Sequence, residues 1–124
     1  MSENEACVGV VDDEISLVRT YELLFKHKNI PVCFVALDGR EALKKFQVSD
    51  PKPKVMIIDY RLPFASGIEV MLEIRKIAPE TKTIIISADG EIGEEALKNG
   101  ATLFFKKPVR TKVMIDSIIS LLNS

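Results

Sequence analysis

The sequence predicts an α/β domain built on an open, doubly wound parallel sheet. Five apolar segments of strand length recur along the 124 residues, and they are apolar throughout. Such strands are typical of a parallel sheet covered by helices on both faces, because a half-exposed strand would alternate with polar residues. Segments of helical period lie between them, which is the pattern of right-handed β–α–β crossovers. No linker or repeat interrupts the pattern, so we expect residues 1–124 to form one domain.

The elements follow in order from the positions of the apolar residues. Strands are predicted at Ala6–Val11, Pro31–Ala36, Val55–Asp59, Thr83–Ser87 and Thr102–Lys106. The first three helices are predicted from apolar residues at helical spacing: Leu17, Val18, Tyr21, Leu24 and Phe25; then Ala42, Leu43 and Phe46 after a capping Asp38; then Val70, Met71, Ile74 and Ile77 before Pro79. A short helix over Gly93–Asn99 and a final helix over Thr111–Leu122 complete the set.

Composition excludes several classes of function. Hydrophobic residues make up 47% and charged residues 28%, as in an ordinary soluble globular protein. The net charge of −1 favours neither nucleic acid nor an anionic membrane as a partner. No apolar run approaches the roughly 20 residues that cross a bilayer, and the polar N-terminus is unlike a secretory signal. Cys7 and Cys33 are interpreted as small buried hydrophobic residues in a reducing compartment, so we expect a cytoplasmic protein.

Polar residues follow four of the five predicted strands. Asp12 and Asp13 follow the first strand, Asp59 and Ser87 end the third and fourth, and Lys107 follows the fifth. Taken singly, each has a common structural role, as a helix cap, a turn residue or a solvated lysine. Ligands of an open α/β sheet bind at the carboxyl ends of its strands. The joint occurrence of these five residues therefore indicates one functional site.

The chemistry of this set points to phosphoryl transfer. Three close carboxylates repel one another unless a cation lies between them, and an oxygen-rich acidic cluster suits Mg²⁺. A carboxylate can attack phosphorus and carry the group as an acyl phosphate. The transferred oxygens then need a metal on one side and a lysine or hydroxyl on the other. Asp59, which ends an apolar strand, is interpreted as the reacting carboxylate.

At this point the chain resembles the receiver domains of two-component response regulators, from about Ala6 to the C-terminus. The residues that carry the resemblance are Val10-Val11-Asp12-Asp13-Glu14, Asp59 with Pro63 and Gly67, Ser87-Ala88, and Gly100-Ala101 leading to Lys107-Pro108. The resemblance implies a flavodoxin-like fold with strand order 2-1-3-4-5 and five helices. It also implies a role for each matching residue: Asp59 as phosphoacceptor; Asp12, Asp13 and the Arg61 backbone carbonyl as Mg²⁺ ligands; Ser87 and Phe104 as switch residues; Lys107 as the phosphate-contacting lysine; Pro108 after a cis peptide bond.

The implied function is that of a stand-alone receiver, which is not a conventional enzyme. It would accept a phosphoryl group on Asp59 from a histidine kinase or phosphotransfer protein, assist its own phosphorylation and dephosphorylation, and switch the binding of a protein partner. Arg61 and Asp89 occupy the two variable positions that flank the site, where an ion pair between them would hinder attacking water. Whether the chain acts as an output switch, a relay or a phosphate sink stays open.

Two features bear on its output surface. The segment from Ser87 to Gly100 is about two residues shorter than in many relatives, which weakens the case for dimerisation through the fourth helix, fifth strand and fifth helix. In the last helix, Met114, Ile118 and Leu121 are expected to face the sheet, and Ile115, Ile119 and Leu122 to lie near the edge of a wide apolar arc. Two interpretations stay open: a deeply seated helix with some exposed apolar atoms, which is common, or an edge that meets a partner or a second copy.

Four other functions fit the sequence less well. A phosphatase of the haloacid dehalogenase type would need a second aspartate two residues after Asp59, where Arg61 stands. A flavin or dinucleotide domain would need a glycine-rich loop after the first strand, where Asp12-Asp13-Glu14 stands instead. A receiver-like binding module without phosphorylation is disfavoured by the complete acidic set. A histidine phosphocarrier is disfavoured because the single histidine, His27, lies late in the first predicted helix, away from the strand ends.

Overall fold

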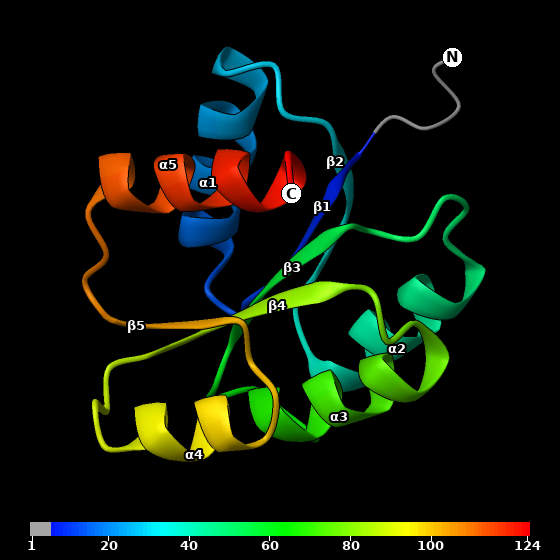
Figure 1. Ribbon diagram of the computed structural model, residues 1–124, viewed down its shortest axis with the longest axis vertical. Helices are drawn as coiled ribbons and strands as arrows, with labels where there is room; N and C mark the ends of the chain where they lie inside the picture. The colour runs from blue at the N-terminus through cyan, green and yellow to red at the C-terminus, as the bar shows by residue number, and fades with distance from the viewer. Residues whose placement is uncertain (1–5) are drawn as a thin grey trace.

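Five parallel strands form one sheet in the order β2-β1-β3-β4-β5, as Figure 1 shows for the computed structural model. The structure describes residues 6–124. The elements are β1 Val8–Val11, α1 Ile15–His27, β2 Val32–Ala36, α2 Gly39–Val48, β3 Val55–Asp59, α3 Gly67–Ile77, β4 Lys82–Ser87, α4 Ile92–Lys98, β5 Leu103–Lys106 and α5 Thr111–Leu122. The predicted fold class and strand order are therefore confirmed.

The helices cover the sheet on both faces. Helices α1 and α5 lie on one face, and α2, α3 and α4 lie on the other (Figure 1). One core cluster includes Phe46, Met71 and Ile74 from the α2–α3 side, and the other includes Phe25 and Ile118 from the α1–α5 side. Strand β3 supplies both clusters, because Met56 and Ile58 belong to the first whereas Val55 and Ile57 belong to the second. This two-sided burial explains why the strands are apolar throughout.

The register brings the ends of four strands, β1, β3, β4 and β5, to one edge of the sheet. Val11 at the end of β1 lies opposite Ile58, one residue before Asp59, and Asp59 lies opposite Ile86, one residue before Ser87. Ser87 in turn lies opposite Lys106 at the end of β5. Strand β1 lies between β2 and β3, so the chain reverses its direction of travel across the sheet there. Ligands bind open α/β sheets at such a reversal.

Local signals set most helix boundaries. The Asp38 carboxylate accepts a 2.8 Å hydrogen bond from the Glu41 amide, so Asp38 caps α2 as predicted. Helix α3 begins with a capping box of Ser66 and Glu69, which the sequence analysis did not identify. The C-terminal end of α5 is capped by a residue far away in the sequence, because Lys54 Nζ donates to the carbonyl of Leu122 at 2.7 Å.

Two sequence interpretations are wrong. Cys7 and Cys33 are not separate thiols, since the structure joins them in a disulfide with their Cα atoms 5.4 Å apart. Cys7 immediately precedes β1 and Cys33 lies in the neighbouring strand β2, a proximity that depends on strand pairing. In α5, Ile115 is buried instead of lying at the exposed edge, whereas Ile119 is 39% exposed as expected. Leu121 and Leu122 are both half-buried, so the edge is narrower than predicted.

Two X–Pro peptide bonds of the described residues are cis. The Lys107–Pro108 peptide bond is cis, as predicted, and Asp50–Pro51 is a second cis bond that was not predicted. Within residues 6–124, none of the helices is both long and apolar enough to span a membrane.

Candidate functional site

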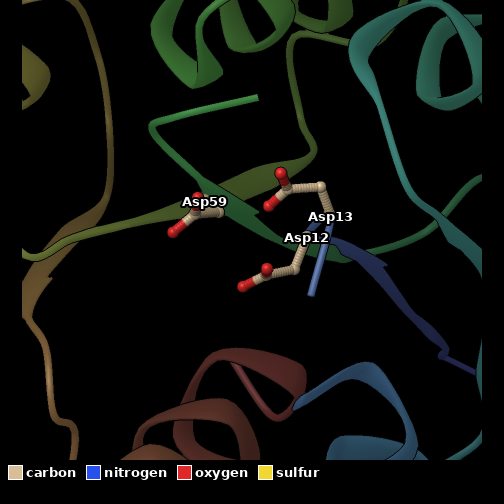
Figure 2. A group of neighbouring side chains, drawn as sticks. All are labelled: Asp12, Asp13 and Asp59. Carbon is tan, nitrogen blue, oxygen red and sulfur yellow. The ribbon is translucent and has the colours of Figure 1, made fainter. Parts of the chain in front are cut away.

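Three carboxylates meet at the carboxyl edge of the sheet. Asp12 and Asp13 directly follow β1, and Asp59 is the last residue of β3. One carboxylate oxygen from each lies within 4.8 Å of the others, and Figure 2 shows the three groups converging. Asp12 and Asp59 are only 2% and 6% exposed, whereas Asp13 is open to solvent. The predicted acidic cluster is therefore present, with one member at its open side.

Lys107 reaches this cluster from the far side of β4. Its Nζ lies 2.8 Å from Asp59 Oδ1 and 3.5 Å from Asp12 Oδ2. The Lys107 backbone amide donates to the Ser87 carbonyl at 2.9 Å, which ties the segment after β5 to the end of β4. The side chain therefore projects over the strand ends as a cation facing two buried carboxylates.

Burial and charge shift the pKa values of these groups. Burial raises the pKa of Asp12 and of Asp59 above their usual value, although Lys107 lowers each in part. Burial works to lower the pKa of Lys107, but its hydrogen bond to Asp59 and the nearby Asp12 outweigh that effect and raise it. The site therefore holds two carboxylates whose ionised form is costly, beside an ammonium group held in its charged form.

This donor set fits a hard divalent cation. The oxygen atoms belong to carboxylates, and Mg²⁺ binds such ligands while keeping waters for a phosphate oxygen to replace. Burial disfavours the ionised forms of Asp12 and Asp59, and a cation between the carboxylates would offset that cost. The cluster could therefore bind a metal.

Ser87 and Asp89 are joined by local hydrogen bonds. Ser87 is 2% exposed, and its Oγ accepts a 3.0 Å bond from the Asp89 amide. The Asp89 carboxylate accepts from the Glu91 amide at 2.9 Å, just before α4 begins. Within residues 6–124, no ion pair connects Asp89 with the exposed Arg61. The Asp89 carboxylate is engaged by the turn that leads into α4, and its pairing with Arg61 stays a prediction.

Phe104 lies on β5 beneath the short helix α4. Its ring is half-buried, and a Cβ built on Gly93 would come within 2.8 Å of its Cδ2 atom. A residue larger than glycine at that point of α4 would therefore collide with the ring. Phe104 packs with the cluster on the α2–α3 side of the sheet, so its neighbours are apolar. The predicted shortness of α4 is confirmed at seven residues.

Sequence reasoning missed the relation of Tyr21 to the site. Tyr21, from α1, and Lys107 line a common hollow of about 240 Å³ between α1 and α5. Burial first, and then the charge of Asp12, raise the pKa of the Tyr21 phenol to about 12. Helical spacing alone places Tyr21 on the buried face of a helix and predicts no link to the strand ends. The available signal was a hydroxyl among aliphatic neighbours, since a buried tyrosine usually presents its polar end to a polar group.

Comparison with known proteins identifies the family. Residues 8–119 match the model described as the response regulator receiver domain. The chain belongs to that family. It is 31% identical over 113 residues to the chemotaxis protein CheY of Thermotoga maritima, which covers 90% of this chain and 92% of the relative. It is 29% identical over 111 residues to CheY of Listeria monocytogenes, covering 88% and 92%.

Solved receiver structures share the fold of this receiver. A response regulator receiver domain protein from Clostridium thermocellum superposes with a TM-score of 0.88 at 28% identity, covering 95% of this chain and 94% of that one. The response regulator protein TrrA of Thermotoga maritima, in complex with Mg²⁺-BeF, superposes with a TM-score of 0.82 at 26% identity, covering 94% and 98%. The resemblance deduced from the motifs is therefore confirmed at the level of family and fold.

Proposed function

We propose that this receiver accepts a phosphoryl group on Asp59 from a phosphohistidine of a kinase or phosphotransfer protein. The observation that carries the proposal is the contact of a buried Asp59 carboxylate with Lys107 at 2.8 Å, beside Asp12 and Asp13. An Asp59 oxygen would attack phosphorus and form an acyl phosphate, and the donor imidazole would leave with the electrons of its P–N bond. Lys107 would then pair with a phosphoryl oxygen in place of the Asp59 oxygen that has reacted.

The proposed metal is Mg²⁺, held by Asp12, Asp13, Asp59 and the Arg61 backbone carbonyl. When bound, Mg²⁺ would neutralise charge on the phosphoryl oxygens. The chain's own part is to hold the acidic residues in position. Asp12 accepts a 2.9 Å hydrogen bond from the Glu14 amide, which orients its carboxylate at the start of α1. Asp13 contributes the exposed oxygen, from the side on which a donor would approach.

The switch would run through Ser87 and Phe104. The Ser87 hydroxyl now accepts from the Asp89 amide, and turning it toward a phosphoryl oxygen would release that bond next to α4. Phe104 has no hydroxyl, so its part would be limited to packing against Gly93 and α4. A local charge change would thus bias the packing of a neighbouring element, which a protein partner could detect. A homodimer is a second form of the same output.

Arg61 and Asp89 would tune the lifetime of the acyl phosphate. Arg61 stands on the loop after β3, and Asp89 stands on the loop after β4. Their influence would come through the effect of each side chain on attacking water. Replacing either with alanine should change the rate of phosphate loss while leaving Asp59 reactive.

The experiment uses phosphoramidate, a small donor whose P–N bond resembles that of phosphohistidine. We expect the wild-type protein to gain one phosphoryl group in the presence of Mg²⁺ and to remain unmodified with a chelator. Asp59→Asn should remain unmodified in both conditions, whereas Asp116→Asn, on the surface of α5, should react like wild type. Equal modification with and without the chelator would contradict the metal assignment, and a reactive Asp59→Asn protein would contradict the phosphoacceptor.

A further inference from the structure

A strained, exposed aromatic residue stands five positions beyond Asp59. Phe64, in the loop between β3 and α3, has a backbone φ of 76° and a side chain that is 66% exposed. A bulky residue in this left-handed region is a conformational outlier, because its Cβ crowds the backbone. Strain of this kind persists where the surrounding structure enforces it, and it points to a use for the side chain. Neither burial nor the phosphoacceptor chemistry explains a phenylalanine here.

The Phe64 ring is held in place from α2. The Arg40 guanidinium carbon lies 4.2 Å from the ring centroid, which is a close cation–π contact. The Gly39 amide donates to the Pro63 carbonyl at 3.3 Å and so ties the same loop to the first turn of α2. An exposed ring fixed in this way loses little conformational freedom when it is covered, which suits the anchor of an interface.

Three hollows border the Phe64 ring, and one of them, of about 650 Å³, is also lined by Asp13 and Arg61. The other two lie along α2. One, of about 600 Å³, lies between α2 and α3 and is lined by Phe64, Leu43, Val70 and Leu72 among others. The second, of about 920 Å³, runs along the other side of α2 and is lined by Phe64, Leu37, Leu43 and Lys44 among others. Leu72 is 37% exposed, so apolar surface continues from the ring onto α3. We call the surface formed by Arg40, Leu43, Lys44, Phe64 and Leu72 the Phe64 face.

The Phe64 face carries two positively charged side chains that are not paired with any carboxylate in the described part of the chain. Within residues 6–124, neither Arg40 nor Lys44 has a carboxylate within ion-pair distance. The neighbouring acids are engaged, because Glu41 pairs with Lys45 at 3.2 Å and Glu73 pairs with Lys76 at 3.0 Å. Two others, Asp38 and Glu69, accept backbone amides as helix caps. Asp38 and Glu69 keep their negative charge. The hollow along α2 is nevertheless lined by the cations Arg40, Lys44 and Lys45 against the acids Asp38 and Glu41, so positive charge is in excess there.

We propose that the Phe64 face binds an acidic, amphipathic segment of a partner protein. An apolar side chain of that segment would pack beside Phe64 and Leu72, and its carboxylates would meet Arg40 and Lys44. The face lies on the α2–α3 side of the molecule, away from β5 and α5 (Figure 1). Binding there goes beyond the proposed function, because it involves no phosphoryl transfer, although Phe64 also borders a hollow that Asp13 and Arg61 line. Binding at the Phe64 face requires no phosphorylation. An experiment can therefore show that the face does not bind peptides without affecting the assignment of Asp59, and the reverse.

The test pans a display library of random peptides, about 15 residues long so that each can form three to four helical turns, against the full chain. We expect enriched peptides to combine acidic residues with large apolar ones. Their affinity should fall at least about tenfold, a difference of about 1.4 kcal/mol, for Phe64→Gly and for the double variant Arg40→Glu with Lys44→Glu. Glycine adopts the left-handed backbone freely, so Phe64→Gly should fold. Leu97→Ala, which removes an exposed leucine from α4, is the matched control and should bind as wild type does.

Three results would overturn the proposal. Enriched peptides that bind Phe64→Gly and wild type equally would show that the ring is not the anchor. Enrichment of basic or uncharged peptides, or no enrichment at all, would contradict the proposal that the partner segment is acidic and amphipathic. Sedimentation that shows wild-type dimers and monomeric Phe64→Gly would assign the face to a second copy of this chain. Retained phosphorylation of Asp59 in both variants would confirm that the effect is confined to the Phe64 face.

Discussion

The Nζ atom of Lys107 lies 2.8 Å from Oδ1 of Asp59. Two residues distant in sequence thus form a charged hydrogen bond at the edge of the sheet before any phosphoryl group arrives. The contact partly offsets the burial that raises the pKa of Asp59. It also means that Lys107 is already close to the oxygen that the proposed reaction would modify, so the residue has both a structural and a chemical role.

Replacing Lys107 with glutamine should destabilise the protein in the absence of metal. The buried Asp59 and Asp12 carboxylates would lose their cation, which should lower the free energy of unfolding by about 1–3 kcal/mol. Urea unfolding in the presence of a chelator measures this. Lys106→Gln is the matched control, since Lys106 is exposed and should cost less than about 0.5 kcal/mol. An equal loss for the two variants would contradict the structural role of Lys107.

Asp13→Asn should separate metal binding from folding. Asp13 is exposed, so the substitution should change metal-free stability by less than about 0.5 kcal/mol. It removes one carboxylate of the cluster, so the rise in melting temperature on adding Mg²⁺ should shrink. Thermal unfolding of wild type, Asp13→Asn and Asp116→Asn at increasing Mg²⁺ measures both quantities. A wild-type melting temperature that does not respond to Mg²⁺ would favour a receiver-like module without phosphorylation.

Tyr21 should make the protein less stable at alkaline pH. Its folded pKa is about 12 and its reference value is 10.0, so the unfolded chain releases the phenolic proton first. The stabilisation that comes from the protonated Tyr21 phenol is thus complete below the pKa of the unfolded state. It is lost as the pH rises toward the pKa of the folded state. Between about pH 9 and about pH 11, wild type should lose about 1 kcal/mol more than Tyr21→Phe. Urea unfolding of both proteins at these pH values tests this, and parallel losses would refute the buried phenol.

Gly93→Ala should destabilise the protein although alanine is the better helix former. Alanine normally stabilises a helix interior by about 1 kcal/mol relative to glycine. Here its Cβ would meet the Phe104 ring at 2.8 Å, and overpacking of this kind costs about 1–3 kcal/mol. Gly90→Ala is the control, since its nearest neighbour is the flexible Lys106 side chain.

A second substitution identifies the cause of the Gly93→Ala effect. Phe104→Leu removes the ring, so Gly93→Ala should cost much less in that background than in wild type. If Gly93→Ala lowers the free energy of unfolding equally in wild type and in Phe104→Leu, a collision with the Phe104 ring is not the cause.

The sequence predicted most of the fold because one signal repeats. The continuous apolar strands report two-sided burial, and the acids at the ends of β1 and β3 mark the carboxyl edge of the sheet. The strand order came from the family resemblance, since periodicity carries no information on which strands are neighbours. The Cys7–Cys33 bond was missed for the same reason, because it depends on the pairing of β1 with β2.

The site was predicted less completely where local bonds compete with charge. The sequence offered an ion pair between Arg61 and Asp89 but gave no sign that the Asp89 carboxylate accepts the amide of Glu91, two residues ahead. The link from Tyr21 to Lys107 and the left-handed backbone of Phe64 both arise from tertiary packing. Neither leaves a pattern in the sequence, since a tyrosine on a helix face and a phenylalanine after a proline are ordinary in themselves.

The most direct test of the account is to locate the phosphoryl group. The protein is incubated with a small acyl-phosphate donor and Mg²⁺, digested, and the modified residue is mapped by mass spectrometry. The account predicts modification of Asp59 alone, no modification of Asp59→Asn, and a slower reaction of Lys107→Gln. A label that persists in Asp59→Asn at the rate and stoichiometry of wild type would contradict it.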